Sequence, residues 1–217
     1  MNTVGSGLRP IAATERSLSD RAYNQILAAV LDGGFKPGDR LIMDRLADDL
    51  GISRTPVRDA LQRMQGDGLV EAAPKGYAIR TLTAEDVAAM YEARVPVEGL
   101  AARIVAGIAE EARESISTAL DCFSGLAEDV PSESFLTNRA FHRSIVSAAR
   151  NPVLVDCFDA IWGRGLAVLS FAETSRSGDH VEERDENQRL FMEIMSGDPD
   201  RAEAETIAHI HRGAASV

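Results

Sequence analysis

Glycine and proline divide the segment from residue 18 to residue 80 into short units, and this division is the strongest constraint on the fold. Apolar residues recur at three- and four-residue steps from Leu18 to Val30, and a glycine pair at 33–34 ends this predicted helix. A second short helix is predicted to end at Gly51, and a third to start at a Ser53 cap and close near residue 66. Two extended runs, 69–72 and 77–80, flank a turn rich in proline and glycine. Three helices and a β-hairpin in this order predict a winged helix-turn-helix.

The rest of the chain contains no convincing strand. Thr83 and Asp86 have the spacing of a capping box and are predicted to open a long helix that runs to about residue 108. Further helices are predicted over about residues 110–128, 133–149, 153–174, 182–196 and 199–212. Short connections between helices predict an antiparallel bundle. The predicted fold is mainly α, with a flexible tail at 1–17, a winged helix-turn-helix domain at 18–80 and an all-helical domain at 81–217.

Charge is distributed unevenly between these two parts. The chain has 23 basic and 34 acidic residues, a net charge of −11, which on its own argues against a nucleic-acid partner. Residues 1–80 have 11 basic and 10 acidic residues, whereas residues 81–217 have 12 and 24. Because affinity for DNA depends on the local cationic surface, the acidic helical part need not oppose DNA binding by the first part.

Several classes of protein are not expected. No apolar run approaches the roughly 18 residues that a membrane span needs, and the N-terminus lacks the layout of a secretion signal, which favours a cytoplasmic protein with no membrane partner. Cys122 and Cys157 lie in apolar helical patterns and are expected to be buried free thiols. No HExxH, paired-carboxylate or nucleophile–base motif is present, so an enzyme is not expected.

The start of the third predicted helix combines arginine with hydroxyl side chains. Arg54 and Arg58 are four residues apart and therefore share one face. Arginine reads guanine edges or clamps phosphates, and hydroxyl groups bind phosphate. The tip of the predicted hairpin could reach the adjacent groove or backbone. The alternative is a solvated basic face on a structural helix. The candidate DNA-binding residues are Ser53, Arg54, Thr55, Arg58, Lys75 and Gly76.

These segments resemble a known family. The segments are FKPGDRL at 35–41, LA at 46–47, GISRTPVRDALQRMQGDGLV at 51–70 and PKG at 74–76. On them, residues 18–80 resemble the DNA-binding domain of the GntR transcription regulators. The resemblance implies that Arg54 and Arg58 contact the operator, with Ser53, Thr55 and the hairpin tip assisting. Asp44 departs from the fatty-acid-responsive branch, which has an arginine there, so the base contacts of that branch cannot be transferred as a set.

The helical part resembles the FCD effector domain of the FadR subfamily over roughly residues 84–212. The matching segments are YEAR at 91–94 with Glu98, NRAFH at 138–142, NP at 151–152, EN at 186–187, GD at 197–198 and residues 202–209. Their order and spacing carry the resemblance. It implies that this domain senses a ligand and forms a homodimer.

Many members of that subfamily hold a divalent metal with one Asp and three His. The corresponding positions here are Asn138, His142, Asn187 and His209, so two of the four expected ligands are amides. Amide oxygens are weaker ligands than the carboxylate and the imidazole that they replace. Two interpretations stay open: the set holds a metal such as Zn, Ni or Mn weakly, or the amides and imidazoles bind the effector directly without metal.

Arg94 is the further candidate effector-binding residue. It lies four residues from Glu98, so it could form a surface ion pair, or it could face the bundle core and bind a carboxylate. The resemblance favours the second, since these domains commonly sense small organic acids. The sequence thus predicts a dimeric repressor that binds an inverted-repeat operator and is released by a small carboxylate effector. The alternatives are a purely structural helical domain and a helical metal-dependent enzyme.

Overall fold

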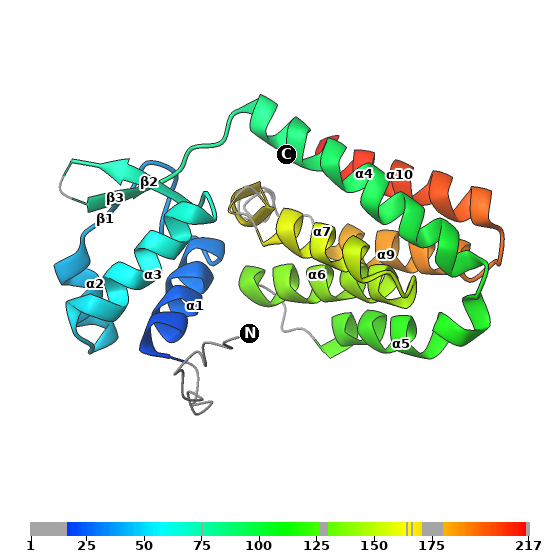
Figure 1. Cartoon of the computed structure of the whole chain (residues 1–217), viewed down its shortest axis with the longest axis horizontal. Coiled ribbons are helices and arrows are strands. Elements are labelled where there is room, and N and C mark those ends of the chain that lie inside the picture. Colours follow the sequence, from blue (N-terminus) through cyan, green and yellow to red (C-terminus); the bar gives the residue numbers. More distant parts are fainter. Residues whose placement is uncertain are drawn as a thin grey trace, which may run out of the picture.

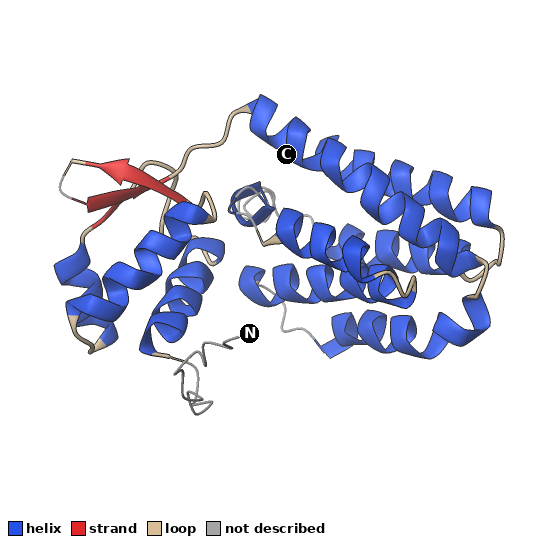
Figure 2. Cartoon of the chain, in the orientation of Figure 1, coloured by secondary structure: helices blue, strands red, loops and turns tan. Residues whose placement is uncertain are grey.

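A computed structural model describes residues 17–74, 76–125, 130–163, 165, 167–170 and 180–215 of the chain. It has two parts, a small mixed domain and a larger helical bundle (Figures 1 and 2). The small domain contains α1 (Leu18–Leu31), α2 (Met43–Leu50) and α3 (Arg54–Gly66). Its strands are β1 (Arg40–Leu41), β2 (Val70–Ala73) and β3 (Gly76–Ile79). This arrangement confirms the predicted winged helix-turn-helix.

Local sequence signals explain the helix boundaries in the small domain. Ser17 and Asp20 form a capping box that starts α1, with the Asp20 amide donating to Ser17 Oγ at 3.1 Å. Gly51 ends α2 with φ 64°, a left-handed conformation that glycine adopts without a steric penalty. Ser53 is the N-cap residue of α3, as predicted, but its side chain makes no capping hydrogen bond.

The sheet has one strand more than the predicted hairpin. Its order is β1-β3-β2 and all pairs are antiparallel, with Val70 opposite Ile79 and Arg40 opposite Ala78. Strand β1 has only two residues, which is too short to show the alternation that identifies a strand in sequence. The domain core lies between this sheet and α3, where Leu41, Leu61 and Met64 are fully buried.

The bundle contains α4 (Ala84–Ala106), α5 (Ala109–Asp121), the short 3-10 helix η1 (Cys122–Gly125), α6 (Pro131–Ala148), α7 (Pro152–Trp162), α9 (His180–Ile194) and α10 (Pro199–Ala215). The capping box predicted for α4 is confirmed, since the Asp86 amide donates to Thr83 Oγ1 at 3.1 Å. Figure 1 shows α4 and α10 along one side of the bundle, with α6, α7 and α9 below them.

Two predicted helices differ in extent from those in the structure. The helix predicted over 153–174 is interrupted after Trp162, because Gly163 follows as a C-cap whose amide donates to the Asp159 carbonyl oxygen at 2.8 Å, and residues 165 and 167–170 are helical again. The helix predicted over 110–128 ends at Asp121, where the tighter η1 begins. Residues 126–129 and 171–174 lie outside the described part of the chain, as does the predicted tail up to residue 16.

The two cysteines are free but exposed, so the prediction of buried thiols was wrong. The buried face of α7 consists of Leu154, Phe158 and Trp162, at four-residue steps, and Cys157 lies one position off this face. Cys122 lies beyond Leu120, the last buried residue of α5. In the described ranges, no helix combines the length and apolar character required to cross a membrane.

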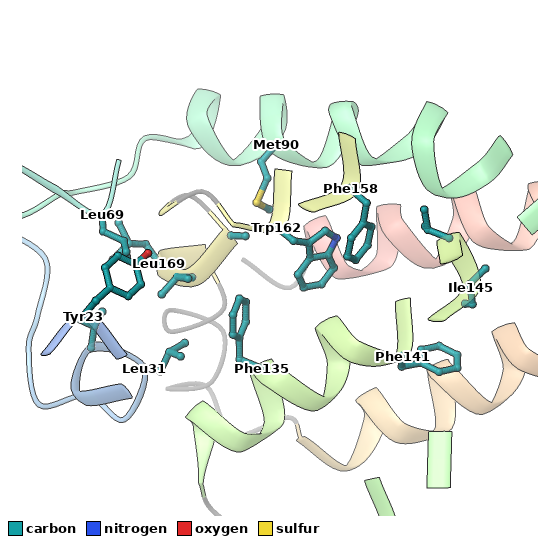
Figure 3. Close-up of a cluster of buried hydrophobic side chains, with 14 of the residues drawn as sticks. Tyr23, Leu31, Leu69, Met90, Phe135, Phe141, Ile145, Phe158, Trp162 and Leu169 are labelled. Atoms are coloured by element: carbon teal, nitrogen blue, oxygen red, sulfur yellow. The ribbon is translucent and has the colours of Figure 1, made fainter. Parts of the chain in front are cut away.

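The two domains share one apolar cluster. Tyr23, Leu31 and Leu69 of the small domain lie near Phe135 and Leu169 of the bundle (Figure 3), and all are buried. At the same junction, the Gly165 amide donates to the Asp67 carbonyl oxygen at 2.5 Å. A side chain at Gly165 would overlap the backbone of Gly68 and Leu69, so glycine is required for this close approach.

Candidate nucleic-acid interface and buried polar cluster

The N-terminal end of α3 is an exposed surface with basic and hydroxyl groups. Val57, Ala60, Leu61 and Met64 face the core, which turns the other face of α3 to solvent. The side chains of Arg54 and Arg58 are 68% and 53% exposed, and Ser53 and Thr55 are exposed beside them. The structure therefore places these four predicted residues at one helix end. Gly76 begins β3, and Lys75 lies outside the described residues.

Arg54 has an acidic neighbour on the preceding helix. Its Nε lies 2.9 Å from Oδ1 of Asp44 in α2, and both side chains are mostly exposed. Arg58 lies 3.4 Å from Asp59. Exposed ion pairs of this kind contribute at most about 1 kcal/mol, so a phosphate or a guanine edge can replace the carboxylate. The departure at Asp44 thus gives Arg54 an exposed and weak ion-pair partner.

Arg63, the third arginine of α3, contacts helix α1. Its Nη1 donates to Asp20 Oδ1 at 3.0 Å, and its guanidinium lies over the Tyr23 ring at 4.3 Å. Arg63 therefore ties α3 to α1 and lies toward the other end of α3 from Arg54.

A polar cluster occupies the interior of the bundle, where apolar side chains would be expected. Its centre is Glu98 of α4, which is buried and accepts from three side chains. Arg94 Nε donates to it at 2.7 Å, His142 Nδ1 of α6 lies at 2.9 Å, and Trp162 Nε1 of α7 donates at 3.1 Å. The Arg94 guanidinium also lies over the Trp162 ring at 4.5 Å. The predicted ion pair of Arg94 with Glu98 is present, but it lies inside the bundle and not on its surface. Binding of a carboxylate ligand by Arg94 stays a prediction.

The remaining predicted residues extend this cluster. His142 and His209 of α10 face one another with 3.3 Å between their Nε2 atoms. Asn187 of α9 donates from Nδ2 to Oδ1 of Asn138 at 3.0 Å. Asn187 is fully buried, and its Oδ1 has no hydrogen-bond partner among the described residues. Arg94, His142 and Asn187 are thus buried in the bundle and Asn138 and His209 are partly buried, and contacts link the five predicted residues in two groups.

Burial and charge determine the protonation states in the cluster. Burial alone would raise the pKa of Glu98, but Arg94 and His142 outweigh it and lower that pKa. Burial lowers the pKa of His142 despite the opposing effect of Glu98. Burial also lowers the pKa of His209 well below its usual value, with further contributions from His142 and Arg94. Glu98 is therefore ionised beside the Arg94 cation, and burial favours the neutral form of both imidazoles.

The sequence did not predict that Trp162 donates a hydrogen bond to Glu98 in the bundle interior. Glu98 was visible only as a possible ion-pair partner four residues from Arg94, and Trp162 only as part of an apolar stripe. The Trp162 ring stacks on His142 with centroids 5.5 Å apart. No spacing rule predicts a contact between α4, α6 and α7, so the sequence carried no signal for this arrangement.

The cluster does not fit the divalent metal that the resemblance implies. Its four donors at the expected positions are two neutral imidazoles and two neutral amides, and Glu98 is engaged by its three donors. Over the part of the chain that is described, no group of three His, Cys, Asp or Glu side chains is arranged to hold a metal ion. The two amides are weaker ligands than the carboxylate and the imidazole that they replace.

An exposed arginine-bearing helix on a winged helix-turn-helix, joined to a helical bundle with a polar interior, defines a DNA-binding transcription regulator. Comparison with protein families agrees. The model described as "Bacterial regulatory proteins, gntR family" matches residues 18–76, and the FCD domain model matches residues 77–212. The chain therefore belongs to the GntR family of transcription regulators and has an FCD domain; it is a regulator and not an enzyme.

Individual relatives support this assignment. The HTH-type transcriptional regulator YdhC of Bacillus subtilis is 31% identical over 199 residues, which cover 87% of this chain and 86% of YdhC. The crystal structure of Escherichia coli McbR/YncC matches with a TM-score of 0.70 at 21% identity, over 93% of this chain and 97% of McbR. A GntR transcriptional regulator from Rhodococcus sp. RHA1 matches with a TM-score of 0.71 at 23% identity, over 91% and 95% of the two chains.

Proposed function

We propose that this regulator is a cytoplasmic, dimeric repressor that a small organic acid releases from an inverted-repeat operator. The polar cluster carries this proposal, because burying an arginine, a glutamate, an imidazole and an amide is costly for a bundle that serves only as a scaffold. Two relatives are named as repressors. They are the "Probable D-xylose utilization operon transcriptional repressor" of Paenarthrobacter nicotinovorans, 26% identical over 200 residues, and GlaR of Escherichia coli, 22% identical over 190.

In this proposal α3 enters the major groove with its N-terminal end toward the bases. Arg58 lies one turn inside the helix and reaches a base edge, and Arg54 at the first position binds a phosphate or a base. Ser53 and Thr55 donate to phosphates. Lys75 and Gly76 at the wing tip approach the adjacent backbone. Two such domains in a dimer require half-sites related by two-fold symmetry.

Two helices connect the polar cluster to the DNA-binding domain. Helix α6 carries Asn138 and His142, and near its N-terminus both the amide and Oγ of Ser132 donate to the carboxylate of Asp32, at 3.0 and 3.2 Å. Asp32 is the C-cap residue of α1. Helix α7 ends at Trp162, three residues before the Gly165 contact with Asp67. A ligand that shifts α6 or α7 therefore moves the DNA-binding domains and changes their spacing.

The experiment combines ligand binding with DNA release. DNA is first selected by the native protein from a random-sequence pool, and an inverted repeat is expected. Small carboxylic acids are then screened for a rise in melting temperature and for loss of the DNA complex. Asp32→Ala removes the contact with Ser132, so this variant is expected to keep the melting shift and to release DNA at least about fivefold less effectively.

Release that is equal in native protein and Asp32→Ala would show that coupling does not pass through the start of α6. If none of the acids raises the melting temperature of a protein that binds DNA, the helical domain is structural only, and the proposed repressor mechanism is wrong.

The exposed face of α4 is the proposed dimer surface. Leu100 and Ile104 are four residues apart on one face and are 43% and 36% exposed. The double variant Leu100→Glu/Ile104→Glu is expected to be monomeric by light scattering and to bind the operator at least about tenfold more weakly, because the second half-site no longer benefits from a linked partner. Met192→Glu on α9, another exposed apolar position, is the matched control. A double variant that remains dimeric would exclude this surface.

A further inference from the structure

The open hydrogen-bonding atoms of the polar cluster indicate the chemistry of its ligand. We propose that the cluster works without a divalent metal and directly binds a small acid that carries a hydroxyl or ammonium group beside its carboxylate. This inference rests on the proposed ligand response. It goes further, because it names the ligand class and because the metal implied by the family resemblance is replaced by hydrogen bonds from the protein.

The contacts of the two histidines indicate where their ring hydrogens lie. A carboxylate can only accept, so His142 Nδ1, 2.9 Å from Glu98, carries a hydrogen. An imidazole whose hydrogen is on Nδ1 has its lone pair on Nε2, so His142 Nε2 accepts from Nε2–H of His209 at 3.3 Å. With its hydrogen on Nε2, His209 has its lone pair on Nδ1, which is therefore an acceptor. The nearest carboxylate oxygen, on Glu186, is 3.6 Å away and cannot donate.

The two asparagines of the cluster are hydrogen-bonded to each other. Asn187 uses Nδ2 to donate to Asn138, which leaves Asn187 Oδ1 as an acceptor. Among the described residues, neither Asn187 Oδ1 nor His209 Nδ1 has a hydrogen-bond partner, although both atoms are buried. Buried polar groups are nearly always paired in proteins. Because both open atoms are acceptors, the absent partner is a donor. A carboxylate alone offers none, whereas a hydroxyl or ammonium group does.

Two of the four metal-ligand positions of the family pattern have amide side chains in this chain. The aspartate of the family pattern is replaced by Asn138, and one histidine by Asn187, so no anionic ligand remains. A divalent cation would have to compensate for its own desolvation with neutral donors only.

The metal part is tested by restoring the family pattern. Native protein purified without chelators is expected to retain no transition metal by elemental analysis, and EDTA should leave its melting temperature unchanged. Asn138→Asp/Asn187→His is expected to bind one Zn²⁺ or Ni²⁺ per chain and to melt earlier in EDTA. Native protein with one metal per chain, removable by EDTA, would overturn the proposal. A double variant that folds but stays empty would also overturn it, since the asparagines would not be the cause.

The ligand part uses acids that differ in a single donor, namely malate against succinate and lactate against propionate. The hydroxy acid is expected to raise the melting temperature at a concentration roughly tenfold lower than its partner, because only it satisfies the buried acceptors. Asn187→Leu removes one acceptor and should abolish this preference. Equal responses to both members of each pair would overturn the proposal. If no acid acts at all, the proposed ligand response fails, while the metal measurements still stand on their own.

Discussion

Replacement of Glu98 by glutamine is expected to lower the free energy of unfolding by about 3–5 kcal/mol. The buried carboxylate accepts from Arg94, His142 and Trp162, at 2.7, 2.9 and 3.1 Å. An amide at this position can accept through one atom only, and its NH₂ group would face a donor. The Arg94 guanidinium would also lose the charge of the carboxylate that accepts from it at 2.7 Å. Removal of one partner from a buried pair is costly for this reason, even where the intact pair contributes little net stability.

Urea and thermal unfolding of the native protein and Glu98→Gln measure this effect. Glu110→Gln is the matched control, because Glu110 pairs with Arg113 at 3.2 Å on the surface, and it should change stability by no more than about 0.5 kcal/mol. Arg94→Met/Glu98→Leu removes both charges together and should recover part of the loss, while the donors of His142 and Trp162 stay unpaired. A loss below about 1 kcal/mol in Glu98→Gln would mean that water reaches the carboxylate and that the cluster is not sealed.

The contrast between Glu98 and Asn138 shows which parts of the cluster can be predicted from sequence. Asn138 and His142 are four residues apart, and helical spacing alone places them on one face of α6. Glu98 receives two of its donors from other helices, so no local rule reveals its central position. The spacing of Arg94 and Glu98 predicted the ion pair but not its burial, because small residues lie on several faces of α4 and blur the apolar period.

Helix boundaries follow the same division between local and tertiary signals. The capping box at Thr83 and the end of α2 at Gly51 depend on neighbouring residues and were predicted. The end of α7 at Trp162 was not predicted. Gly163 is tolerated within many helices, but here the chain must turn so that Gly165 can contact the Asp67 backbone of the other domain. That requirement comes from domain packing and is not encoded in local periodicity.

On the proposed DNA-binding surface, Arg58→Ala is expected to weaken operator binding by about 1–3 kcal/mol, or roughly 5- to 150-fold. Its side chain is 53% exposed and lies one turn inside α3, near the end of a recognition helix that reaches base edges. Folding should be unaffected, because the core face of α3 is formed by other residues. Gel-shift or fluorescence titration against the selected operator measures the change, and the melting temperature verifies the fold.

Arg150→Ala supplies the matched control for Arg58→Ala. Arg150 is an exposed arginine of the helical domain, paired with Glu111 at 2.9 Å, so the variant removes the same formal charge away from α3 and should bind the operator as the native protein does.

The salt dependence of operator binding then identifies the kind of contact that Arg58 makes. If Arg58 reads a base, affinity falls for the operator and little for unrelated DNA, whereas a phosphate contact would weaken both and reduce the salt slope by about one. An Arg58→Ala variant with native affinity would exclude Arg58 from the interface.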